Sequence, residues 1–299
     1  MTLVVALIGS EAIWLLTDRR LTRDGQLASD EATKIVGLDT LEGRALLGYA
    51  GLGRTEALMQ PSEWMANVLR GRNGTLEQLL GVLAGVAELE IPPHLGGISP
   101  AHFVLIPAIV ANQPRAYSIR IDSTSDGHKL SWTRHFRRPH SGKPEERPPY
   151  LMLAGSGANY LGARKGWVRK LLRLVGRFDA GECSAESVAD ALGDLGYEVH
   201  RSVDSVGPTA VVAWRIVDQG EHHRGGGGHL GYINGKRGDP AVRIPQVALG
   251  NDLLAVGDRM MNFMLSQMVN GNFPDEPIDP RKLEAAMDVP PEPPDDRLR

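Results

Sequence analysis

Three residues near the start of the chain stand at distances that suggest acyl-transfer chemistry. Thr2 is followed by Asp18 and then by Lys34. If Met1 is removed, Thr2 carries a hydroxyl and a free α-amine on one residue, and the amine can act as the base for the hydroxyl. A nearby lysine ammonium favours the deprotonated hydroxyl, and a carboxylate beside it keeps the lysine charged. The spacing therefore predicts an amidohydrolase with Thr2 as the nucleophile.

Short apolar runs rich in β-branched residues must position these groups. Leu3–Ile8 and Ala12–Leu16 flank a Gly-Ser-Glu turn, and this pattern predicts a hairpin at the start of the chain. Thr33–Val36 and Ala45–Ala50 predict a second strand pair. Asp18 and Lys34 then lie at or near strand ends.

The rest of the chain alternates between helical and strand patterns. The order is strands, two helices, strands, two helices, strands, which predicts helices outside a pair of sheets. The predicted helices are Arg54–Leu69, Leu76–Leu89, Ala158–Val175, Ala185–His200 and Asn251–Met268. The predicted later strands are Phe103–Val110, Ala116–Ile121, Leu130–His135, Leu151–Ala154 and Thr209–Val217.

Composition narrows the class of protein. The chain has 299 residues and a formal net charge of −3, so its charge balance points neither to nucleic acid nor to a membrane surface. Its one cysteine, Cys183, cannot form an internal disulfide, which is typical of a reducing, cytoplasmic compartment. We expect neither a signal peptide nor a membrane span, because Glu11 and Asp18 interrupt the first apolar stretch.

Four segments together resemble the start of a proteasome β-type subunit, including the simpler bacterial peptidase rings of that family of N-terminal nucleophile (Ntn) hydrolases. They are Thr2, Asp18-Arg19-Arg20, Ala32-Thr33-Lys34 and Gly48-Tyr49-Ala50-Gly51. The resemblance implies that Thr2 is the nucleophile and that Asp18 and Lys34 support it. It also implies a structural role for Arg20 and an oxyanion-binding N–H at Gly51.

A later segment extends the resemblance. Gly155-Ser156-Gly157 follows a predicted strand and precedes a helix, where the family places a serine near the terminal amine. The family then has an aspartate, matched by Asp204, and a serine three positions on. Gly207 occupies that serine position, and neither Ser205 nor Thr209 is in register with it.

Two further residues are implied to contact substrate. Tyr49 matches a position that lines the family's primary specificity pocket, and a tyrosine there predicts small or slim apolar residues at the cleavage site. A core tyrosine is an equal alternative. Thr22 is placed to line the channel and to offer main-chain hydrogen bonds to an extended peptide.

The resemblance implies a fold and an assembly. The expected fold class is α+β, a four-layer α/β/β/α sandwich of the Ntn-hydrolase type. The expected division is a hydrolase domain over residues 1–218 and a C-terminal extension over residues 219–299. Expected partners are a peptide or unfolded protein substrate and further copies of the chain in a ring. An ATPase partner stays unknown, and no nucleic acid, membrane, metal or organic cofactor is expected.

Alternatives remain at several positions. The chain could be a non-catalytic assembly subunit, given Gly207, or an amidase acting on a small molecule. Asp18 and Arg20 could form an ordinary turn ion pair, Lys34 could face solvent, and Ser156 could cap a helix. His222, His223 and His229 match no standard zinc spacing.

Overall fold

The computed structural model describes most of the chain in eight segments. They are residues 2–23, 26–51, 60–91, 103–124, 127–135, 149–217, 226–238 and 242–269. Several sequence expectations fall outside these segments: the first part of the predicted helix Arg54–Leu69, His222 and His223, and the part of the C-terminal extension from residue 270 onward.

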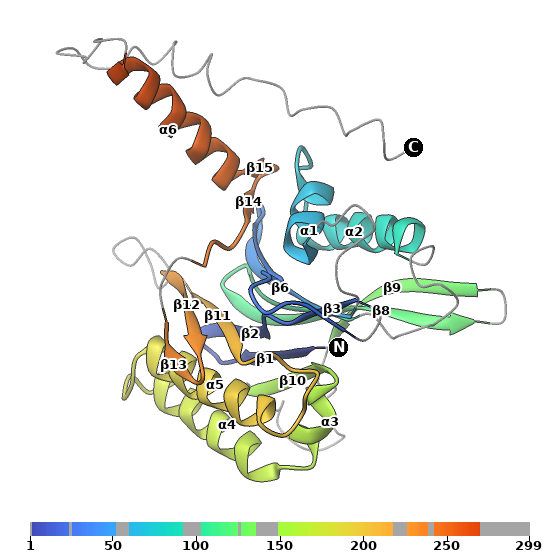
Figure 1. Ribbon diagram of the computed structural model, residues 1–299, viewed down its shortest axis with the longest axis vertical. Coiled ribbons are helices and arrows are strands. Elements are labelled where there is room, and N and C mark those ends of the chain that lie inside the picture. The colour runs from blue at the N-terminus through green and yellow to red at the C-terminus, as the bar shows by residue number, and fades with distance from the viewer. Residues whose placement is uncertain are drawn as a thin grey trace.

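A six-stranded sheet carries the start of the chain (Figure 1). Its strand order is β10-β1-β2-β11-β12-β13, and all of its pairs are antiparallel. The strands are β1 (Leu3–Ile8), β2 (Ala12–Asp18), β10 (Tyr150–Gly155), β11 (Thr209–Ile216), β12 (Gly227–Ile233) and β13 (Lys236–Arg237).

A seven-stranded sheet lies against the first, in the order β15-β14-β5-β6-β7-β8-β9. Only the β14–β5 pair is parallel. The strands are β5 (Ile35–Asp39), β6 (Gly43–Ala50), β7 (Phe103–Val110), β8 (Gln113–Thr124), β9 (Gly127–His135), β14 (Gln246–Ala248) and β15 (Asn251–Asp252). A separate two-stranded ribbon joins β3 (Leu21–Arg23) to β4 (Gln26–Ser29).

The expected fold class is wrong. We predicted an α+β chain with a four-layer α/β/β/α sandwich of the Ntn-hydrolase type. The described residues are instead mostly β, with 40% in strands and 34% in helices, in mostly antiparallel sheets. The sequence patterns underestimated the strands because the β3–β4 ribbon and strands β13 to β15 are short and largely polar, so they carry no apolar alternation.

Strands that follow residue 218 take part in both large sheets. β12 pairs with β11 along its whole length, from Thr209 opposite Ile233 to Arg215 opposite Gly227. β14 pairs with β5 and extends the seven-stranded sheet. The segment after residue 218 therefore contributes to both sheets, while the division into two domains stays a prediction.

Apolar residues on both faces of the strands form three buried clusters. β1 shows the arrangement, because its side chains alternate between two clusters. Leu3, Val5 and Leu7 belong to the cluster under the helices of residues 157–200, and Val4, Ala6 and Ile8 belong to the cluster shared with the second sheet. All six residues are fully buried. A strand covered on both faces reads as a continuous apolar run, which explains the sequence of β1.

The helices pack on the sheets by their apolar sides. α1 and α2 share a buried cluster with β5 to β8, and α3, α4 and α5 share one with β1, β2 and β11. α2 begins at a capping box in which Thr75 accepts the N–H of Gln78. The helices are α1 (Pro61–Leu69), α2 (Leu76–Glu90), α3 (Gly157–Gly162), α4 (Lys165–Asp179), α5 (Ala185–His200) and α6 (Leu253–Val269).

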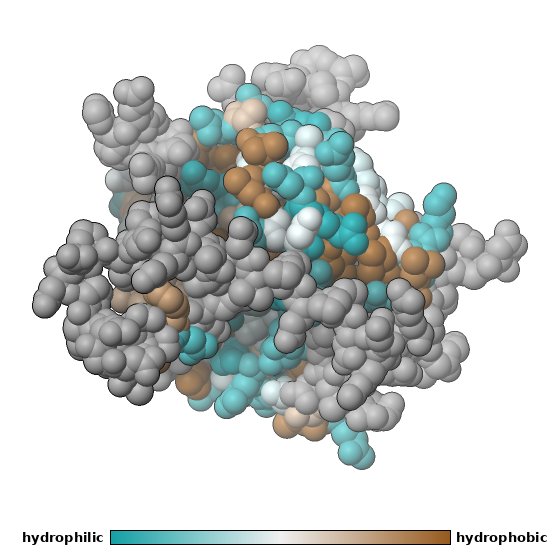
Figure 2. Space-filling model, turned by 90° about the horizontal axis from the view of Figure 1, so that it is seen from above, coloured by the Kyte–Doolittle hydropathy of each residue, from teal (hydrophilic) through white to brown (hydrophobic). Residues whose placement is uncertain are grey.

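Helix α6 lies apart from the sheets and follows β15 directly (Figure 1). Met261 and Leu265 are among its exposed apolar side chains. Seen from above, apolar and polar residues are interspersed over the described surface (Figure 2). Within the described segments, none of the helices combines the length and apolarity needed to cross a membrane.

Candidate functional site

Thr2 directly precedes β1, which is an interior strand of the six-stranded sheet. β1 runs between β2 and β10, and Leu3 stands opposite Gly155. The main-chain carbonyl of Thr2 accepts a hydrogen bond from Ser156 Oγ at 3.3 Å and another from the N–H of Gly157 at 3.4 Å. These contacts fix the main chain of Thr2, which is only 2% exposed.

Asp18, at the end of β2, accepts hydrogen bonds from several other residues of the site. Its Oδ1 accepts the N–H of Leu3 at 2.8 Å and also the hydroxyl of Thr2. Its Oδ2 accepts the N–H of Arg20 and the N–H of Gly207, both at 3.1 Å. A carboxylate buried to 1% exposure needs such donors, because an unsolvated charge is costly unless it is hydrogen-bonded.

Lys34 completes a buried triad with Thr2 and Asp18. Its Nζ donates to Thr2 Oγ1 at 2.7 Å and lies 3.1 Å from Asp18 Oδ1. The third contact is the carbonyl of Arg20, at 2.6 Å. The alternative of a solvent-facing lysine does not hold, since Lys34 is 2% exposed.

Burial lowers the pKa of Lys34 from its ordinary value of 10.5, and the charge of Asp18 opposes that shift. The main chain holds Lys34 in place, because its carbonyl accepts the N–H of Tyr49 on β6 at 3.0 Å. Chemically, an ammonium directed at a hydroxyl oxygen stabilises the alkoxide character that a nucleophile needs.

The Gly-Ser-Gly segment lies against the chain start, as the residue order suggested. Gly155 has φ of +86°, and a Cβ there would come within 2.0 Å of the Thr2 carbonyl oxygen. Only glycine allows this approach. Ser156 precedes α3 and makes no capping hydrogen bond, so its hydroxyl is available to Thr2 and to Ser205, whose Oγ is 2.7 Å away.

Gly207 stands where the family resemblance called for a serine, and the structure gives the physical reason for the glycine. A Cβ at Gly207 would lie 2.9 Å from Arg20 Cβ and 3.0 Å from the Arg20 main-chain nitrogen. The main chain can therefore approach closely enough for its N–H to reach Asp18. Ser205, two positions earlier, supplies the hydroxyl that meets Ser156.

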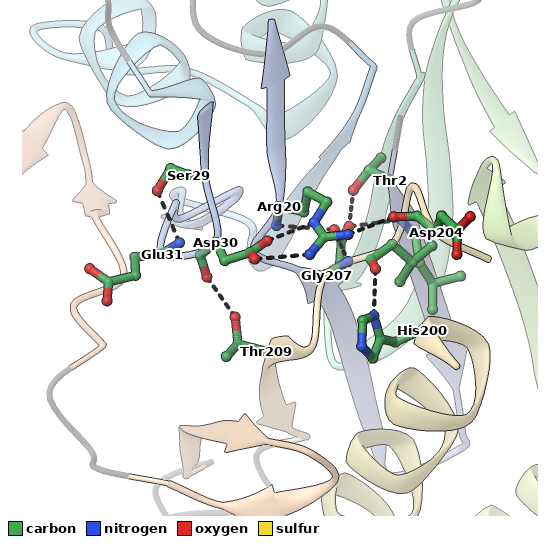
Figure 3. Close-up of polar contacts among 12 residues, drawn as sticks. Thr2, Arg20, Ser29, Asp30, Glu31, His200, Asp204, Gly207 and Thr209 are labelled. Atoms are coloured by element: carbon green, nitrogen blue, oxygen red, sulfur yellow. Dashed lines mark hydrogen bonds and ion pairs between the residues drawn. The ribbon is translucent and has the colours of Figure 1, made fainter. Parts of the chain in front are cut away.

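Arg20 lies between Asp30 and Asp204 (Figure 3). Its guanidinium forms a two-pronged ion pair with Asp30, at 2.7 and 2.9 Å, and donates to the carbonyl of Asp204 at 2.5 Å. The hydrogen bond to Asp30 raises the pKa of Arg20, and the same contact lowers the pKa of Asp30. Asp204 thus contributes its main chain here, and its side chain is exposed.

Three other predicted site residues are Gly51, Tyr49 and Thr22, and none of them has a described hydrogen bond to a triad side chain. Gly51 directly follows β6 and is partly buried. Tyr49 is 5% exposed and belongs to the cluster under α1 and α2, with its ring centroid 6.4 Å from that of Trp64. Thr22 is partly buried in the β3–β4 ribbon, opposite Leu27.

Sequence reasoning missed Asp30, the partner of Arg20. Asp30 follows the β3–β4 ribbon, and its carbonyl also accepts the hydroxyl of Thr209 at 2.6 Å. No periodic pattern marks this ribbon. The described segments also contain no group of three or more histidine, cysteine or acidic side chains arranged to hold a metal ion.

Comparison with models of known protein families found no match, and comparison with curated proteins found none either. The resemblance to proteasome β-type subunits therefore depends on the residues themselves and stays a prediction.

Proposed function

We propose that this chain is a threonine-type peptidase or amidase that uses Thr2 as an N-terminal nucleophile. One observation carries the proposal. The Lys34 ammonium donates to Thr2 Oγ1 at 2.7 Å, and both groups are buried with Asp18. An ammonium held against a hydroxyl oxygen favours the deprotonated, nucleophilic form of that hydroxyl.

The proposed reaction begins with removal of Met1, which frees the α-amine of Thr2. Thr2 Oγ attacks the carbonyl carbon of an amide, and its proton passes to the α-amine directly or through a water molecule. The tetrahedral intermediate collapses as the C–N bond breaks and the leaving amine takes a proton. The resulting ester on Thr2 is hydrolysed by water, which restores the hydroxyl.

Other residues are assigned supporting roles in this proposal. Lys34 stabilises the developing negative charge on Thr2 Oγ, and Asp18 keeps Lys34 charged and oriented. The N–H of Gly51 binds the oxyanion of the intermediate. Ser156 donates to the carbonyl of Thr2, and the family resemblance assigns it the further role of positioning the freed amine. Thr22 is proposed as a substrate contact carried over from the family, whereas the burial of Tyr49 in the cluster under α1 and α2 supports the alternative of a core tyrosine.

The proposed substrate is a peptide or unfolded protein, and the proposed setting is a cytoplasmic ring of identical subunits. The substrate and the ring follow from the family resemblance, and the compartment follows from the single cysteine. The hydrogen bond between Ser205 and Ser156 favours an intact site over the alternative of a non-catalytic assembly subunit, because it offers a hydroxyl near the place where Gly207 lacks one.

Intact-mass measurement of the purified protein tests the requirement for a free amine. We expect a mass lower than that of the full chain by one methionine, because Thr2 is small enough for the preceding bond to be cleaved by methionine aminopeptidase. Edman sequencing beginning at Thr2 would establish the new terminus. A population that fully retains Met1 would contradict the proposed mechanism and favour the assembly-subunit alternative.

A further inference from the structure

Helix α4 has one exposed side that is strongly basic, which we call the basic face of α4. It consists of five exposed cations: Lys165, Arg169, Lys170, Arg173 and Arg177. Four of them recur at every fourth residue, so they form a row on one side of the helix, about 6 Å apart along its axis. α4 lies on the side of the six-stranded sheet that faces away from the seven-stranded sheet (Figure 1).

The opposite side of α4 is apolar and packs on the protein itself. Leu171 and Val175 are buried in the cluster that α4 shares with β1, β2 and β11. Phe178 makes an edge contact with Trp14 of β2, with ring centroids 5.0 Å apart. The apolar side chains of α4 are therefore covered by the rest of the chain, and the basic face is the side that a partner can reach.

The acids of the chain leave most of this charge uncompensated. Arg177 is paired with the exposed Glu182 at 3.3 Å. Asp179, the one acid of α4, accepts the N–H groups of Ser10 and Glu11. The helix carries a net charge of +4, five cations against one acid, and the whole chain carries −3, so the remaining residues carry −7. In the part of the chain that the structure describes, four cations have no acid within ion-pair distance: Lys165, Arg169, Lys170 and Arg173.

Two glycines of α4 leave room for close approach beside the cations. Gly166 and Gly176 are exposed, and a Cβ placed at either would meet no described atom within 4 Å. Packing within the chain therefore does not require glycine at these positions, although glycine lowers helix stability relative to alanine. The missing side chains allow the main chain of a partner to lie close to the row of cations.

These features favour an acidic protein segment over a lipid surface or nucleic acid. Insertion into a membrane needs exposed apolar side chains, and those of α4 are packed inside. Single-stranded nucleic acid stacks on free aromatic rings, but Lys170 Nζ covers the ring of Trp167 at 4.3 Å from its centroid. A long duplex would also meet the negative charge of the remaining residues. Carboxylates at every fourth residue of a helix repeat at about the same 6 Å as the row of cations.

We propose that the basic face of α4 docks an acidic helix of a partner protein, with Asp or Glu at every fourth residue. Arg169 and Arg173 lie in the middle of the row and bind carboxylates through paired N–H groups. The main chain of the partner passes over Gly176. Docking uses none of the residues around Thr2, so this proposal and the proposed hydrolysis can fail separately.

Fluorescence anisotropy tests the docking with a labelled peptide of about 20 residues, long enough to span α4 as a helix. Glutamate recurs at every fourth residue of this alanine-rich probe, and glutamine replaces it in the control peptide. We expect saturable binding of the acidic peptide that weakens as ionic strength rises, and no binding of the control. A short DNA duplex and phosphatidylserine vesicles are separate probes. Tighter binding of either of these, or no saturable binding of the acidic peptide, would overturn the proposal.

Variants locate the binding on α4. Arg169→Gln combined with Arg173→Gln should weaken it roughly tenfold, because two exposed ion pairs are lost. Arg72→Gln combined with Lys129→Gln removes the same charge from exposed positions after α1 and on β9, and should change little. Gly176→Gln should weaken binding without lowering thermal stability, because its side chain enters open space. Circular dichroism confirms folding. Unchanged affinity in either α4 variant, or an equal loss in the control, would show that the assignment is wrong.

Discussion

Replacing Thr2 with alanine is expected to abolish peptide hydrolysis. The variant keeps the β1 main chain and its contacts to Ser156 and Gly157 but lacks the proposed nucleophilic hydroxyl. Loss of a covalent nucleophile typically lowers kcat by at least about 10³-fold. Steady-state hydrolysis of a panel of fluorogenic peptides would measure it.

Thr2→Ser is the matched variant, because it keeps the hydroxyl and loses only a methyl group. We expect it to retain a measurable part of the activity after Met1 is removed. Both variants should fold, as judged by circular dichroism and thermal melting. Full activity in Thr2→Ala would show that the hydrolysis arises elsewhere in the protein.

Replacing Lys34 with methionine is expected to lower both activity and stability. Methionine fills a similar volume but leaves the buried carboxylate of Asp18 without its cation. Removing one partner of a buried ion pair costs about 3–5 kcal/mol. We expect about 3 kcal/mol, at the low end of that range, because Leu3, Arg20 and Gly207 still donate their N–H groups to Asp18. Urea denaturation would measure the loss.

The pH dependence of stability distinguishes loss of the Lys34 charge from nonspecific destabilisation. Burial lowers the pKa of Lys34 in the folded chain below its ordinary value of 10.5. At pH values between the folded-state pKa and 10.5, the unfolded chain therefore binds more protons than the folded chain. Wild-type stability should therefore rise with pH in that window relative to Lys34→Met. Lys165→Met, on the exposed face of α4, is the control and should change little. A Lys34→Met protein with unchanged stability and activity would contradict the role assigned to the triad.

Local patterns predicted much of the secondary structure. Leu3–Ile8, Phe103–Val110 and Ala185–His200 have the predicted bounds, because continuous apolar runs and helical periodicity are local signals. The predicted helix Ala158–Val175 is two helices, α3 and α4, separated at residues 163 and 164. The predicted helix Asn251–Met268 begins later, because Asn251 and Asp252 pair with β14.

The fold class could not be obtained in the same way. It depends on which short strands join which sheet, and β13, β14 and β15 have two or three residues each. Such strands are stabilised by their partners and leave no periodic pattern in the sequence.

The candidate site, like the fold, was predictable from the sequence only in part. The spacing of Thr2, Asp18 and Lys34 indicated a triad. The β1–β2 hairpin holds Asp18 beside the start of β1, and Lys34 reaches both from the residue before β5. The Arg20–Asp30 pair and the Ser156–Ser205 contact depend on long-range packing. Gly207 looked like a departure in the sequence, but its lack of a Cβ is what lets the main chain reach Asp18.

Covalent labelling tests the central claim most directly. A β-lactone acylates activated hydroxyl nucleophiles, and peptide mapping by mass spectrometry locates the adduct. The proposal predicts one adduct per chain, on a peptide that begins at Thr2, and none in Thr2→Ala. An adduct on any other residue, or no adduct on a folded protein that begins at Thr2, would contradict it.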